Sequence, residues 1–270
     1  MHQSQNQLID RLSVRLFVVS RPVFDMEAFL RFLESEQQSW ERMGSAKDSE
    51  SIVEAAGRIC YMSFGQRQYR RPNAEYVANL IKQGHESVLE HVSWSFVLTG
   101  VSRAFSHQFV RHRVGFAFSQ LSQQYHEERD ARFVEPAIIR SHPHLSTLWR
   151  SAVEGSRQAY ASLLESLEEL EQTSLSLPNK REMQRAVRTA ARSVLPNATE
   201  TKIFFTANAR ALRHFLELRG NIAGDEEMRV VSCLLLESLK KEAPSLFDDF
   251  MTQELPDGLP RVVKGAPQAG

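Results

Sequence analysis

The sequence predicts a mixed α+β domain with a modest sheet. Three short segments, 13–19, 93–99 and 202–207, have the composition or alternation of strands, and about half of the remaining chain has helical periodicity. Apolar residues make up 42% and charged residues 24% of the chain, an ordinary globular balance. We therefore expect one domain over residues 1–270. Its core spans about residues 13–253 and contains a variable insert at 20–50, and a flexible tail follows at 254–270.

Periodicity and capping residues predict the helices. In chain order they span 24–43, 51–61, 74–83, 101–113, 145–170, 180–193, 208–219 and 226–241. Asn208 is a typical N-cap, and Gly84 and Gly220 are typical stops. The helix at 101–113 would place Arg103, Arg111 and the histidine between them on one face.

The strands and loops follow from alternation and polarity. In the segment 93–99, Trp94, Phe96 and Leu98 share one side of the predicted strand. Polar or aperiodic stretches are predicted as loops, namely 44–51, 66–72 and 114–125, and Pro178 interrupts the chain between two helices. The tail from 254 contains Pro and Gly and is expected to fray.

Composition narrows the class of protein. Lys plus Arg and Asp plus Glu number 33 each, so the chain lacks the basic excess typical of general nucleic-acid binders. Cys60 and Cys233 form no CxxC pair, and both have apolar neighbours, so we expect reduced core residues. No signal peptide and no apolar stretch of roughly 18 residues is evident. These features predict a soluble, cytoplasmic protein that binds neither nucleic acid nor membrane.

Two neighbouring segments could bind an anion. Arg111, His112 and Arg113 form a basic cluster whose guanidinium groups suit phosphate oxygens, although a helix C-terminus also favours cations. The following stretch from Phe118 to Tyr125 is rich in hydroxyl and amide groups that could wrap a nucleotide, or could form an ordinary polar connector.

A third cluster lies at 208–219. Arg210 falls in the first turn of the predicted helix, where the helix dipole disfavours a cation, and a bound anion would remove that conflict. Arg210 and His214 share one face, which a simple solvated basic face would also explain. By contrast, His85 and His91 are six residues apart and do not match the HExxH spacing, so a metal site is not predicted.

Together these segments resemble the flavin-dependent thymidylate synthases. Arg111-His112-Arg113, followed after eight residues by Ser122, is similar to that family's RHR-x(7–8)-S signature. The segment 85–91 resembles its flavin-contacting motif, and 192–201 and 208–219 resemble its two later motifs. The resemblance covers about residues 53–250. It implies an α+β fold with a central, mostly antiparallel sheet flanked by helices, and a homotetramer with active sites shared between subunits.

The resemblance also implies a reaction and the residues that serve it. The expected activity is C5 methylation of a uracil nucleotide, dUMP or UMP, with FAD as cofactor, NADPH as reductant and 5,10-methylenetetrahydrofolate as carbon donor. Carried over by position, the FAD-binding residues are His85, Ser87, Glu90, Arg111, His112, Arg113, Asn208, Arg210 and His214, of which the first three would reach FAD from another chain. The nucleotide-binding residues are Gln108, Arg111, Gln120, Leu121, Ser122, Gln123, Gln124, Arg192 and Arg219. Arg219 is the catalytic residue, since it would stabilise negative charge at the uracil ring.

The chain departs from the family pattern near the expected nucleotide. Gln124 stands where the family's S-x-R-Y motif has an arginine that pairs with the phosphate, and Ala223 stands where a flavin-contacting histidine is common. Losing one charge-assisted hydrogen bond costs roughly 1.5–3 kcal/mol unless it is compensated. These changes predict a shifted preference that includes UMP, as in the polyoxin-type antibiotic-pathway relatives.

Three other interpretations stay open at this stage. The chain could be a housekeeping enzyme restricted to dUMP. It could be a degenerate paralogue that keeps flavin and has lost methylation. It could also be a nucleotide- or RNA-binding module, although few aromatic residues accompany the basic cluster.

Overall fold

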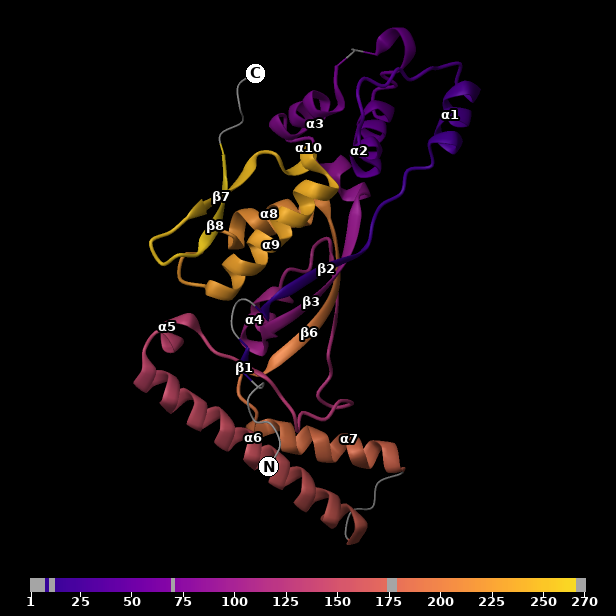
Figure 1. Ribbon diagram of the computed structural model, residues 1–270. Coiled ribbons are helices and arrows are strands. Elements are labelled where there is room, and N and C mark those ends of the chain that lie inside the picture. Colours follow the sequence, from indigo (N-terminus) through magenta and orange to yellow (C-terminus); the bar gives the residue numbers. More distant parts are fainter. Residues whose placement is uncertain (1–7, 10–12, 69–70, 174–178, 266–270) are drawn as a thin grey trace. The chain divides into compact units, whose positions relative to one another are not determined.

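The computed structural model describes residues 8–9, 13–68, 71–173 and 179–265 (Figure 1). Its strands are β1 (Leu8–Ile9), β2 (Arg15–Ser20), β3 (Ser93–Ser102), β4 (Phe116–Gln120), β5 (Phe133–Val134), β6 (Glu200–Asn208), β7 (Phe250–Glu254) and β8 (Pro260–Lys264). The predicted break at Pro178 and part of the predicted loop at 66–72 lie outside the described residues.

The α-helices contain more of the described residues than the strands do. They are α1 (Met26–Ser35), α2 (Asp48–Ile59), α3 (Asn73–Lys82), α4 (Arg103–Phe109), α5 (Ala137–Arg140), α6 (Pro143–Thr173), α7 (Lys180–Ala191), α8 (Ala209–Arg219), α9 (Glu226–Glu242) and α10 (Pro244–Phe247). Short 3-10 helices are η2 (Gly65–Arg67), η3 (Glu86–His91) and η4 (Arg192–Val194).

The central sheet has the strand order β2-β3-β6-β4. Ser95 bonds Thr206, and the Gly100 N–H donates to Glu200, so β3 and β6 run in opposite directions. The predicted alternation in β3 is confirmed, because Trp94, the phenylalanine at 96 and the leucine at 98 are all buried. The predicted α+β fold with a mostly antiparallel sheet is thus confirmed.

The chain divides into two compact units, each described by itself. Unit 1 comprises 1–15, 98–111 and 118–204, and unit 2 comprises 16–97, 112–117 and 205–270. In unit 1, α6 and α7 lie side by side over a core of Tyr160, Leu164, Val187 and Ala191 (Figure 1). In unit 2, a separate core beside α1 and α2 contains Leu33, Trp40, Ala55 and Phe64.

Two element boundaries near the basic cluster differ from prediction. Residues 101–102 continue strand β3, and Ser102 then caps α4 by accepting the Phe105 N–H at 3.0 Å. Because α4 ends at Phe109, Arg111 lies beyond it, and the predicted helical face of Arg103 and Arg111 does not form. The stretch 114–125 is not all loop, since β4 occupies its centre as the last strand of the central sheet.

Four further expectations were wrong in whole or in part. The polar stretch 44–51 gives way to α2 at Asp48, and helix α1 covers only the first part of 24–43. The tail forms an antiparallel β7–β8 hairpin through Lys264, with Gly258 at φ 74° in its turn, so its described part does not fray. Cys60 is exposed at the end of α2, so it is no core residue, while Cys233 is partly buried.

Candidate active site

The predicted site residues fall into two sets, one in each unit. Unit 2 holds most of the FAD candidates and the catalytic candidate, namely His85, Ser87, Glu90, His112, Arg113, Asn208, Arg210, His214 and Arg219. Unit 1 holds the remaining candidates, namely Gln108, Arg111, Gln120, Leu121, Ser122, Gln123, Gln124 and Arg192. Sequence positions 111 and 112 therefore belong to different units, although the motif that contains them is continuous.

The N-terminus of α8 is built as predicted. The Asn208 side chain accepts the Ala211 N–H at 2.8 Å and caps the helix. The Asn208 N–H donates to the Gly115 carbonyl at 3.1 Å, which holds the turn after Arg113 against the first turn of α8. Gly115 has φ 72°, and a Cβ there would lie 2.7 Å from the Ala211 Cβ, so only glycine allows this approach.

Carboxylates of η3 neutralise the first-turn cation of α8. Arg210 pairs with Glu90 at 2.6 Å and with Glu86 at 3.6 Å, and its side chain is half-exposed. The conflict expected between Arg210 and the helix dipole is therefore relieved inside the chain, without need of a bound anion. The structure brings the η3 segment and α8 together within one chain, with His85 and Ser87 exposed beside them.

His112 and Arg219, both in unit 2, are joined directly by a hydrogen bond. Arg219 Nε donates to His112 Nε2 at 3.1 Å, which requires an unprotonated nitrogen on the imidazole. Burial, together with the charge of Arg219 and the neighbouring His214, lowers the pKa of His112 below its usual 6.5. His112 is thus neutral at pH 7, and it fixes the guanidinium of Arg219 at the end of α8.

In unit 1, hydrogen bonds order the predicted nucleotide segment. Gln120 Nε2 donates to Ser106 at 2.9 Å and to Thr201 at 3.1 Å. The Leu121 N–H donates to the Lys202 carbonyl at 2.9 Å, which continues the attachment of this segment to β6. The segment after β4 is therefore held against the sheet by both side chain and backbone.

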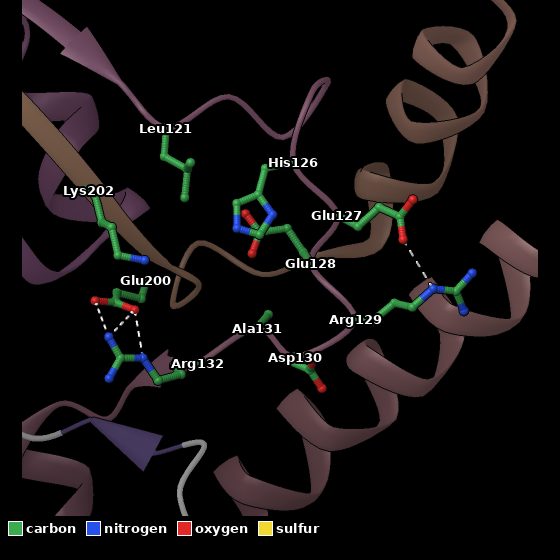
Figure 2. A pocket seen from close by; sticks show the side chains of 10 residues that line it. All are labelled: Leu121, His126, Glu127, Glu128, Arg129, Asp130, Ala131, Arg132, Glu200 and Lys202. Atoms are coloured by element: carbon green, nitrogen blue, oxygen red, sulfur yellow. Dashed lines mark hydrogen bonds and ion pairs between the residues drawn. The ribbon is translucent and has the colours of Figure 1, made fainter. Parts of the chain in front are cut away.

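A pocket of about 260 Å³ lies beside this segment (Figure 2). Leu121 is the one predicted residue in its lining. The other lining residues are His126, Glu127, Glu128, Arg129, Asp130, Ala131, Arg132, Glu200 and Lys202. Sequence reasoning missed all of them, although the dense charge of residues 126–132 was a usable signal.

Buried charges surround the pocket. Burial raises the pKa of Glu128, and the neighbouring side chains of His126 and Arg103 oppose this rise. The Glu128 Oε1 and Gln123 Nε2 atoms are buried and neither meets hydrogen-bond geometry within the described chain, although Gln123 lies close enough to lower the pKa of Glu128. Burial, together with the charge of Arg192, lowers the pKa of Arg103. This cluster contains unsatisfied polar capacity that a polar ligand could use.

The remaining candidates of unit 1 occupy the ends of helices. Gln108 is exposed on α4, and Arg111 is exposed just beyond it. Arg192 begins η4 directly after α7.

Within the described chain, no group of three or more His, Cys, Asp or Glu side chains is placed to hold a metal ion. No described helix combines the length and apolar character needed to cross a membrane.

Comparison with known proteins decides the family. Residues 42–245 match the family model described as Thymidylate synthase complementing protein. Over 209 residues the chain is 44% identical to a flavin-dependent thymidylate synthase of Mycobacteroides abscessus, an alignment that covers 77% of this chain and 82% of that relative. The chain belongs to the flavin-dependent thymidylate synthase family. It is accordingly a flavin-dependent methyltransferase of nucleotide biosynthesis.

Two further comparisons agree with this assignment. A flavin-dependent thymidylate synthase of Corynebacterium efficiens is 41% identical over 214 residues, which are 79% of this chain and 84% of the relative. The crystal structure of the UMP/dUMP methylase PolB from Streptomyces cacaoi, bound with 5-Br dUMP, is similar with a TM-score of 0.63 and 19% identity, covering 90% and 95% of the two chains. That similarity confirms the flavin-dependent thymidylate synthase fold.

The residues at the start of α8 suit the diphosphate of a flavin cofactor. The first turn of α8 has no acidic residue, and Gly115 lets the backbone that follows Arg113 pass close to this turn. Arg113 is exposed, and no ion pair of its side chain occurs among the described residues. The carboxylates Glu86 and Glu90 compete for Arg210, but these ion pairs are solvent-exposed, so a diphosphate can replace them at small cost.

The lowered pKa of His112 predicts a pH effect on stability. Since the unfolded chain binds this proton more readily than the folded one, stability falls as pH drops below 6.5. His112→Asn keeps an oxygen that can accept from Arg219 and does not titrate. Differential scanning calorimetry measures the Tm of both proteins. As the pH is lowered from 7.5 to 5.5, we expect the Tm of the wild type to fall more than that of the variant. A difference that is constant with pH would contradict the lowered pKa.

Proposed function

We propose that this enzyme carries out FAD-dependent reductive methylation at C5 of dUMP, with 5,10-methylenetetrahydrofolate as carbon donor and NADPH as reductant. The observation that carries the proposal is the contact between the neutral His112 and Arg219, which presents a positioned guanidinium at the end of α8. No cysteine nucleophile is required, because a guanidinium at the uracil ring can stabilise the negative charge that makes C5 reactive.

The two sets of residues have separate proposed tasks. Arg219 binds the N3–O4 edge of uracil as a two-pronged donor, with its orientation set by His112. FAD is held by the cations and the helix terminus of unit 2, namely His112, Arg113, Asn208, Arg210 and His214, with Arg111 and the η3 residues His85, Ser87 and Glu90. When bound, the flavin supplies the hydride that converts the transferred one-carbon unit into a methyl group.

The nucleotide is proposed to lie along the segment after β4. The residues proposed to contact it are Gln108, Arg111, Gln120, Leu121, Ser122, Gln123, Gln124 and Arg192. The Gln120 amide is already fixed by two hydroxyl groups, so it offers a preformed carbonyl oxygen to a ribose hydroxyl. Leu121, which follows Gln120 in the chain, lines the pocket described above.

We also propose that UMP is accepted beside dUMP. The support is the neutral Gln124 and the polar pocket beside Leu121, which together alter the surroundings expected for the nucleotide. Hydrogen bonds from α7 hold the segment at Gln124 and Glu127, so mobility of this loop is the less direct explanation of UMP acceptance. Space in the pocket for the ribose 2′-hydroxyl is the more direct explanation.

The proposed assembly is a cytoplasmic homotetramer whose active sites draw residues from several subunits. The free cysteines Cys60 and Cys233 suit a reducing compartment. Light scattering after size-exclusion chromatography tests the assembly, with four chains as the expected result. A monomer that is fully active would contradict shared sites.

The activity is tested by a methylation assay with identified product. Enzyme, FAD, NADPH and methylenetetrahydrofolate are mixed with dUMP or with UMP, and the nucleotide product is weighed by mass spectrometry. We expect a gain of one CH₂ on both nucleotides. Methylation of dUMP alone would contradict UMP acceptance, and NADPH consumption without any methylated nucleotide would contradict the proposed reaction.

A further inference from the structure

Helix α7 presents a row of arginines to the proposed nucleotide segment. Arg181, Arg185, Arg188 and Arg192 follow one another at spacings of four, three and four residues, so they share one face of the helix and its continuation into η4. Three of them contact the loop that follows Ser122. Arg188 pairs with Glu127 at 2.9 Å, and this ion pair lowers the pKa of Glu127.

Arg185 is the member of this row that meets Gln124. Its Nε donates to Gln124 Oε1 at 3.2 Å. Its guanidinium also lies 5.8 Å from the centre of the Tyr125 ring, and that of Arg181 lies 5.9 Å from it. A hydrogen bond and an aromatic contact therefore hold Arg185 at the position where the loop has a neutral residue in place of a cation.

The charge of Arg185 is only weakly neutralised. Its nearest carboxylate is Glu182, at 3.8 Å from Nη1, and the two side chains are 43% and 48% exposed. An ion pair of this length and exposure contributes little. Within the part of the chain that the structure describes, Arg185 Nη2 has no hydrogen-bond partner, so the guanidinium keeps donors for an anion.

We propose that Arg185 supplies, from α7, the cation that grips the phosphate of the nucleotide, and that Gln124 positions it. This inference rests on the proposed nucleotide site. It also explains the amide at position 124: the Gln124 carbonyl accepts from Arg185, whereas an arginine there would set two like charges at hydrogen-bond distance. Gln124 and Arg185 are thus a coupled pair in which the charge has moved from the loop to the helix.

The test compares a ligand that has the phosphate with one that lacks it. Kd values of dUMP and of deoxyuridine are measured by calorimetry on the FAD-loaded enzyme at pH 8, where the phosphate is fully charged. Arg185→Gln is expected to weaken dUMP binding about ten-fold and to leave deoxyuridine binding unchanged. Arg181→Gln is the matched control. It removes the other guanidinium that lies over the Tyr125 ring and leaves the Arg185–Gln124 hydrogen bond intact, so it should change the Kd of neither dUMP nor deoxyuridine.

A rescue variant separates a phosphate contact from a structural role. In the Arg185→Gln background, Gln124→Arg restores a cation at this place, and dUMP affinity should return to within about three-fold of wild type. Three results would each overturn the role of Arg185. They are an unchanged ratio of the dUMP and deoxyuridine Kd values in Arg185→Gln, an equal loss of dUMP affinity in Arg181→Gln, and no recovery of dUMP affinity in the double variant. If the wild-type enzyme binds neither ligand, the proposed function itself fails.

Discussion

Arg219→Ala is expected to lower kcat for dUMP methylation at least about 100-fold, while the purified variant still takes up FAD. Among the described residues its side chain is positioned by His112 and has no acidic partner, so its full positive charge is available to the uracil ring. Loss of one positioned donor to a developing negative charge typically costs two to three orders of magnitude in rate. The measurement is single-turnover formation of methylated nucleotide, with flavin content determined by absorbance.

The alternative role of Arg219 is structural, since a cation in the last turn of a helix favours the helix dipole. Arg219→Lys keeps that charge but loses the fork, so it should remain at least about ten-fold impaired if the fork acts on uracil. Arg31→Ala, on the exposed face of α1, is the matched control and should be fully active. Normal turnover by Arg219→Ala would refute the catalytic role.

Arg210→Glu is expected to raise the Kd for FAD at least about 100-fold. The substitution removes a diphosphate-binding guanidinium and gathers three carboxylates, with Glu86 and Glu90, at the N-terminus of α8. Repulsion of a diphosphate then adds to the lost hydrogen bonds. Flavin fluorescence quenching during titration of the apoprotein measures this affinity.

The same charge reversal at Arg31 provides the control, because Arg31 pairs only with the exposed Glu27 among the described residues and lies on α1. Arg31→Glu should bind FAD as the wild type does. Unchanged FAD affinity in Arg210→Glu would mean that the start of α8 is not where the diphosphate binds.

Local signals predicted some elements well. Helix α8 was predicted correctly because Asn208 caps it and its apolar residues are regularly spaced. Gly220 does end this helix, but for another reason than a left-handed backbone: its φ is −66°, and a Cβ there would lie 2.6 Å from Val262 Cβ. The need for glycine at this position therefore comes from packing against β8, and no local sequence pattern indicates that packing.

Other features depend on contacts between distant segments. Strand β4 escaped prediction because its phenylalanines are only partly buried at the edge of the sheet, and its intervening Ala117 and Ser119 give weak alternation. The start of α4 was misplaced because Ser102 was not identified as its cap. The tail hairpin was missed although Asp257-Gly258 is a typical turn pair.

The candidate site shows the same division. The motif resemblance supplied the positions of the predicted residues, and the structure places His112 against Arg219 and Glu90 against Arg210. The contact between Gln124 and Arg185 joins residues 61 positions apart in the chain, so no motif spacing indicates it. The buried Glu128 is also visible only once β6 and the loop lie together.

The central claim is that cations from distant parts of the sequence hold a flavin diphosphate, and FAD binding by the purified wild-type chain tests it most directly. The apoprotein is titrated with FAD, and the stoichiometry and Kd are read from the change in flavin absorbance and fluorescence. We predict a yellow protein that binds one FAD per chain with micromolar or tighter affinity. A protein that stays colourless and leaves added FAD unbound would contradict the account.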